Sequence, residues 1–72
     1  MLTKANQDSG LTIGDRFSTQ GRGTTFWEIE AITDIRHVGQ IITFAEIGGI
    51  TRMKVHVNDI STKGFHRVAR SK

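Results

Sequence analysis

Apolar and polar side chains alternate along most of the chain from Ile13 onward, and glycines separate the alternating segments. Alternation with a period of two is typical of strands that bury one face, and glycine permits the turns that join them. No window has apolar residues at the 3.6-residue spacing of an amphipathic helix, so we expect no helix longer than one turn. The pattern therefore predicts an all-β domain of short strands.

Five segments fit this description. In the strongest one Trp27, Ile29 and Ala31 share one face. Glu28 and Glu30 share the opposite face, which is the arrangement of a half-buried strand. The predicted strands cover 15–20, 25–33, 40–47, 50–57 and 65–68, and a single turn of 3₁₀ helix is expected at 58–60.

Two adjacent glycines, Gly48 and Gly49, stand between the third and fourth segments. They predict a two-residue hairpin turn in which both glycines have a positive φ, and this turn sets the register of the two strands. The register places Ile42, Phe44, Met53, Val55 and Val57 on the core face, and Thr43, Ala45, Arg52, Lys54 and His56 on the outer face.

Short strands joined by glycine turns favour a curled sheet, because a flat five-stranded sheet leaves one face uncovered. The expected fold is a small five-stranded antiparallel barrel, SH3-like or alternatively OB-like. Residues 1–12 are polar and follow neither period, so we expect a disordered, flexible leader at 1–12 and a single β-barrel domain at 13–70.

Composition narrows the class of protein further. No apolar run approaches the roughly 18 residues of a membrane span, and the chain of 72 residues has no cysteine. We therefore expect a cytoplasmic protein without a membrane partner. A domain of this size buries only about 60% of the surface of its unfolded chain. This makes it marginally stable alone and favours self-association, so a homo-oligomer is expected.

Candidate catalytic and metal-binding groups are sparse. His37, His56 and His66 stand at no short spacing to one another or to a carboxylate, so we expect no metal and no cofactor. Glu28 and Glu30 face the same way, as an acid and base pair would, but so do the carboxylates of any solvated strand face. We expect no enzyme, and the alternative is an enzyme active only as an oligomer.

Charge is distributed unevenly along the chain. The formal net charge is −2 for residues 1–49 and +5 for residues 50–72. A basic surface on a β scaffold is typical of nucleic-acid binders, whose affinity comes mainly from contacts with phosphate. Closure of the sheet would bring the first and last strands together. The predicted nucleic-acid surface, for DNA or RNA, consists of Arg16, Arg22, Lys63, His66, Arg67, Arg70 and Lys72.

A second function explains the same pattern differently. Glu28 and Glu30 can reach across small residues of the next strand toward Arg52 and Lys54, which would make the outer face a self-neutralised ladder of ion pairs. Apolar residues that the register leaves outside then favour a protein partner or assembly. This predicted protein interface consists of Phe26, Ile32, Ile41, Ile47 and Ile50.

Overall fold

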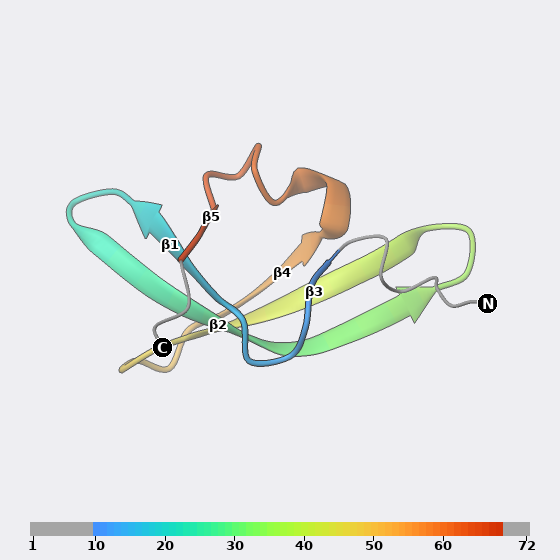
Figure 1. Cartoon of the computed structure of the whole chain (residues 1–72), viewed down its shortest axis with the longest axis horizontal. Helices are drawn as coiled ribbons and strands as arrows, with labels where there is room; N and C mark the ends of the chain where they lie inside the picture. Colours follow the sequence, from blue (N-terminus) through green and yellow to red (C-terminus); the bar gives the residue numbers. More distant parts are fainter. Residues whose placement is uncertain (1–9, 69–72) are drawn as a thin grey trace.

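The computed structural model describes residues 10–68, which form one antiparallel sheet of five strands and contain no α-helix (Figure 1). The ends of all five predicted strands lie within about two residues of those observed, because the period-two pattern marks buried strands well. The elements are β1 (Arg16–Gln20), β2 (Thr24–Ile35), β3 (Gly39–Glu46), β4 (Arg52–His56), the 3₁₀ helix η2 (Val57–Asp59) and β5 (His66–Arg67).

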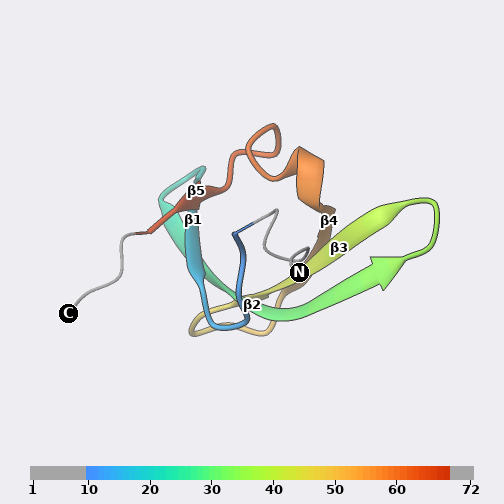
Figure 2. The ribbon, with the colours of Figure 1, turned by 45° about the vertical axis from the view of Figure 1, so that its right-hand side comes forward.

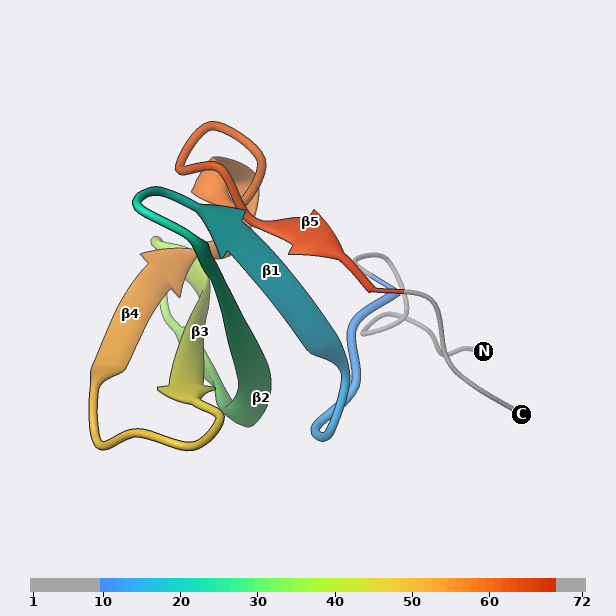
Figure 3. The same cartoon turned by 90° about the vertical axis from the view of Figure 1, so that its left-hand side faces the viewer.

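The sheet has the order β4-β3-β2-β1-β5 and is curled around its core (Figures 1 and 3). The first part of β2 pairs with β1, and β2 continues along β3 into a hairpin that extends away from the body (Figure 2). β4 and β5 end the order and are not hydrogen-bonded to each other. An all-β, five-stranded antiparallel fold is thus confirmed, with a sheet that is curled and not closed in the part described.

Aromatic rings fill the concave side of the sheet. The Phe44 ring stacks on Phe65 with centroids 4.3 Å apart, and meets Phe17 edge-on at 5.3 Å. Trp27 packs against Phe65 at 5.8 Å, and its indole nitrogen donates a hydrogen bond to the Thr19 hydroxyl. Phe44 faces the core as the register predicted, and Phe17, Trp27 and Phe65 are buried beside it. The buried core comprises Phe17, Trp27, Ile29, Ile42, Phe44, Val55, Ile60 and Phe65.

The β3–β4 hairpin has the predicted register, from Ile41 opposite His56 to Ala45 opposite Arg52. The predicted two-residue turn is wrong. The Glu46 amide donates to the Thr51 carbonyl, so the loop holds four residues, and only Gly48 of the two glycines has a positive φ (83°). The predicted turn (48–49) and the observed loop (47–50) have the same centre. The residues on either side therefore stay opposite the same partners.

One residue of this hairpin departs from the expected burial. Met53 lies opposite the fully buried Phe44, yet it is 36% exposed. The reason is that β4 is an edge strand, so no strand lies beyond Met53 to cover it in the described residues. Val57 leaves β4 for η2 and is partly buried against the core.

A β-bulge interrupts the alternation of β2. Ile29 lies opposite Phe44, and Ala31 lies opposite Thr43, the adjacent residue of β3. Glu30 therefore has no residue opposite it in β3. The extra residue reverses the faces of everything after it. Ile32 therefore packs against the core, and its predicted outward orientation is wrong, as is the placement of Ala31 on the core face.

The segment before β1 is tied to the bulged part of β2. Gly14 donates to the Ile29 carbonyl at 2.9 Å, and the Ile29 amide donates to the Asp15 carbonyl at 2.8 Å. Leu11 packs against the core, so ordered contacts begin inside the predicted 1–12 leader. Residues 1–9 of that leader lie outside the described residues.

Candidate binding surfaces

The outer face of the sheet carries a row of side chains that crosses four strands. Arg16 lies opposite Glu28, Glu28 opposite Ala45, and Ala45 opposite Arg52. The small Ala45 side chain lets Glu30 reach over β3, and the Arg52 Nε donates to Glu30 Oε1 at 2.6 Å. Arg16 Nη2 lies 3.9 Å from Glu28 Oε1. The predicted reach of a glutamate from β2 to β4 is confirmed for Glu30 and Arg52.

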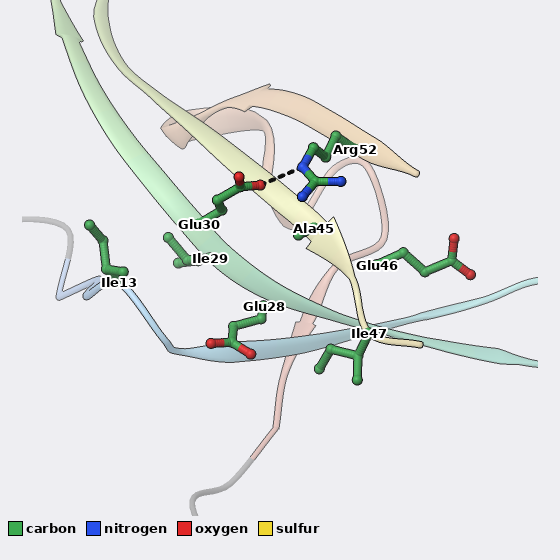
Figure 4. A pocket seen from close by; sticks show the side chains of 8 residues that line it. All are labelled: Ile13, Glu28, Ile29, Glu30, Ala45, Glu46, Ile47 and Arg52. Atoms are coloured by element: carbon green, nitrogen blue, oxygen red, sulfur yellow. Dashed lines mark hydrogen bonds and ion pairs between the residues drawn. The ribbon is translucent and has the colours of Figure 1, made fainter. Parts of the chain in front are cut away.

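A shallow groove of about 480 Å³ lies over this row. Figure 4 shows Glu30 extending to Arg52 on one side, while the Glu28 carboxylate lies between Ile13 and Ile47. Three carboxylates and one guanidinium contribute, so the charged groups of the groove sum to −2. The lining residues are Ile13, Glu28, Ile29, Glu30, Ala45, Glu46, Ile47 and Arg52.

Exposed apolar side chains surround the groove. The Ile47 amide, just after β3, donates to the Phe26 carbonyl of β2 at 2.8 Å, so these two residues are neighbours. Phe26 is 47% exposed, Ile47 40%, Ile13 60% and Ile50 90%. The expected exposure of Phe26, Ile47 and Ile50 is confirmed, whereas Ile41 is half-buried.

Sequence reasoning missed Ile13 as part of this surface. The residue stands immediately before Gly14, in a polar context where the alternation is only starting. The signal available was an isolated large apolar residue outside any predicted strand, which is a weak one. The hydrogen bond from Gly14 to the Ile29 carbonyl ties this segment to β2, and Ile13 lines the groove beside Glu28.

Arg67, predicted to contact nucleic acid, is engaged within the fold. Its Nη2 donates to Asp15 Oδ2 at 2.6 Å and to the Gly10 carbonyl at 3.2 Å, and its guanidinium lies 5.8 Å from the Phe17 ring centroid. The Asp15 side chain is only 4% exposed and also accepts from the Thr12 amide at 3.0 Å. Arg67 thus holds the segment before β1 against β1 and β5.

The other residues predicted to bind nucleic acid differ in where they lie and in whether the structure describes them. β1 and β5 pair as expected, with Ser18 opposite His66. Arg22, Lys63 and His66 are exposed, and within residues 10–68 none of the three makes an ion pair. The β1–β2 loop, which carries Arg22, and the loop before β5, which carries Lys63, lie toward the same end of the molecule (Figures 2 and 3). Arg70 and Lys72 lie outside the described residues.

His56 joins three parts of the fold. Its Nε2 lies 2.6 Å from the Val38 carbonyl, and its Nδ1 accepts from the Asn58 amide at 3.1 Å. The ring therefore donates through Nε2 and accepts through Nδ1, which secures the β2–β3 loop to η2. Among residues 10–68, His, Asp and Glu side chains form no group of three that could hold a metal ion.

No helix in the described part of the chain is long and apolar enough to cross a membrane. Comparison with protein-family models found no matching family. Comparisons with curated proteins and with solved structures also found no significant match. The function must therefore be argued from these surfaces.

Proposed function

We propose that this chain is a non-enzymatic interaction module that binds a segment of another protein on the outer face of its sheet. The observation that carries the proposal is the exposed apolar margin of the groove, formed by Ile13, Phe26 and Ile47. Several exposed large apolar side chains around one groove are uncommon on small soluble domains and mark interaction sites. The self-neutralised Glu30–Arg52 pair leaves this part of the surface little suited to phosphate.

The charges of the groove indicate the chemistry of the partner. Arg52 is already paired with Glu30, and Arg16 lies 3.9 Å from Glu28, with both side chains about half-exposed or more exposed. Glu46 makes no ion pair within residues 10–68. A segment that combines apolar side chains with lysine or arginine is complementary to such a groove.

The proposal is tested with a panel of 12-residue peptides in which apolar residues are combined with either basic or acidic ones. We expect the basic panel to bind with a Kd of roughly micromolar order, as is usual for small transient interfaces. Amide chemical-shift changes in NMR spectra should centre on Ile13, Glu28 and Ile47. I47E should weaken binding at least tenfold, while the matched control I35E should not, because Ile35 is equally exposed (43%) but lies on the β2–β3 arm.

Two results would overturn this function. One is absence of binding by the basic panel, or equal weakening by I47E and I35E. The other is a homodimer in analytical ultracentrifugation that I47E dissociates, which would assign the face to a second copy of the chain. The second result would revive the homo-oligomer expected from the size of the domain.

Nucleic-acid binding is a second candidate function, favoured by exposed cations in the β1–β2 loop (Arg22), in the loop before β5 (Lys63) and in β5 (His66). The Gly21 amide donates to the Gly23 carbonyl, so Arg22 stands at the tip of a tight turn. Contacts from such groups would be with phosphate and insensitive to base sequence. Because Arg67 is paired with the buried Asp15, one cation fewer remains for this role than the sequence predicted.

A salt titration tests this second candidate with fluorescently labelled DNA and RNA oligonucleotides. The double variant R22Q/K63Q should lower the slope of log K against log salt concentration by roughly 2, one unit per lost phosphate contact. R36Q, which removes an exposed arginine from the β2–β3 loop, is the matched control. Undetectable binding at low salt would exclude the candidate.

We further propose that the curled sheet is an SH3-like barrel. The strand order β4-β3-β2-β1-β5 and the 3₁₀ turn before the last strand support this assignment over the OB-like alternative. Absence of a cofactor and a cytoplasmic location stay predictions from the composition.

A further inference from the structure

The edge of the sheet at β4 borders the groove through Arg52, but the proposed function does not use the main-chain groups of this edge. β4 ends the strand order, and no strand lies beyond it within residues 10–68. Residues 50–54 are all exposed. The free edge of a sheet presents unpaired N–H and C=O groups that another strand can join.

Hydrogen bonding in the β3–β4 hairpin determines which groups are free. The Glu46 amide donates to the Thr51 carbonyl, which makes this a hydrogen-bonded pair. Hydrogen-bonded and non-hydrogen-bonded pairs alternate along an antiparallel ladder, so the main-chain groups of Met53 point toward β3. Those of Arg52 and Lys54 consequently point away from the sheet.

The side chains of this edge select among possible occupants. Arg52 and Lys54 share the outer face of β4, and Met53 lies between them on the other face. Antiparallel pairing with a second copy around Met53 would set Arg52 opposite Lys54 of that copy. Like charges directly opposite each other destabilise a sheet, so the edge disfavours its own copy.

We propose that β4 receives an extended segment of a partner protein by strand addition, with acidic residues opposite Arg52 and Lys54 and an apolar residue opposite Met53. Lys54 makes no ion pair within residues 10–68, which leaves it available for a partner carboxylate. Met53, 36% exposed, gains cover from the added strand. The segment differs in charge from the one proposed for the groove, so the two sites are distinguishable.

The test uses three eight-residue peptides with alternating valines: one with glutamate between the valines, one with lysine, and the glutamate peptide N-methylated along one edge. We expect only the unmethylated glutamate peptide to bind, because N-methylation removes main-chain donors and leaves the side chains in place. On binding, hydrogen exchange of the Arg52 and Lys54 amides should slow more than tenfold, while that of the Met53 amide should change little.

Charge reversal supplies the second arm. K54E should abolish binding of the glutamate peptide and admit the lysine peptide, whereas K63E, an exposed lysine outside β4, should change neither. I47E should leave edge binding intact, and K54E should leave groove binding intact, since Lys54 does not line the groove. Failure of one site is thereby separated from failure of the other.

Equal binding of the methylated and unmethylated peptides would overturn strand addition. So would equal binding of the acidic and basic peptides, or slow exchange at Arg52 and Lys54 in the protein without peptide. The comparison of methylated and unmethylated peptides uses the unchanged protein, so it holds even if a variant fails to fold.

Discussion

Two arginine–carboxylate pairs in this protein have the same length and different surroundings. Arg67 and Asp15 approach to 2.6 Å, as do Arg52 and Glu30. The Asp15 carboxylate is 4% exposed and accepts a second hydrogen bond, from Thr12, whereas that of Glu30 is 43% exposed. Water can replace Arg52 at the exposed carboxylate and cannot replace Arg67 at the buried one, so burial and not distance decides which pair the fold depends on.

The two pairs also connect different things. Arg67 and Asp15 are 52 residues apart in sequence, and their contact joins β5 to the segment before β1. Arg52 and Glu30 lie across one small residue on the surface of the sheet, where they border the groove. The same side-chain chemistry therefore holds the fold at one place and shapes a candidate binding face at the other.

The largest expected effect comes from breaking the buried pair. R67M should lower the free energy of unfolding by roughly 2–3 kcal/mol, less than the 3–5 kcal/mol of a fully buried pair because the Arg67 side chain is half-exposed. Asp15 would then stay buried with its Thr12 hydrogen bond but without the Arg67 guanidinium. Urea denaturation followed by tryptophan fluorescence measures the loss, since Trp27 is the only tryptophan.

A double-mutant cycle with D15N sharpens this prediction. The losses of unfolding free energy in R67M and in D15N, added together, should exceed the loss in the double variant R67M/D15N by about 1 kcal/mol or more. Such coupling is expected for groups in direct contact. Additive losses would mean that Arg67 acts through its packing on Phe17 and its bond to Gly10 instead of through Asp15.

Breaking the exposed pair should have a smaller effect. E30Q should cost less than about 1 kcal/mol of unfolding free energy, because both side chains are around half-exposed and solvent screens them. The difference from the parent chain should shrink further in 1 M salt. A loss as large as that of R67M, independent of salt, would contradict the view that burial separates the two pairs.

The smallest effect is expected for the third pair. Arg16 and Glu28 are 3.9 Å apart, and their side chains are 61% and 44% exposed. R16Q should therefore leave the free energy of unfolding unchanged within roughly 0.3 kcal/mol, as for many surface ion pairs. Thermal denaturation of R16Q and E30Q in parallel tests this ranking of the two exposed pairs. A larger loss of stability in R16Q than in E30Q would contradict it.

Local patterns account for much of the fold. Alternation in 25–33 and 40–57 predicted the central strands, and the position of the two glycines predicted a register that a longer loop leaves intact. The bulge at Glu30 was not predicted. The adjacent apolar residues Ala31 and Ile32 break the alternation at this point, but only the pairing with β3 shows which residue is extra. The faces of Ala31 and Ile32 were consequently assigned wrongly.

The candidate sites divide in the same way. Exposure of Phe26, Ile47 and Ile50 followed from alternation, which is a local property. The pairing of Arg67 with Asp15 did not follow from the sequence. Charge counts along a chain do not say which cation contacts a buried carboxylate 52 residues away.

The sequence by itself determined a small all-β chain, its strands, one hairpin register and the inward aromatic residues, since these depend on period-two burial and on turn residues close in the chain. Tertiary structure decided the bulge, the groove beside Ile13, the exposure of Met53 at the sheet edge and the internal use of Arg67. Each of these depends on which strands become neighbours, and hence on contacts between residues far apart in the chain.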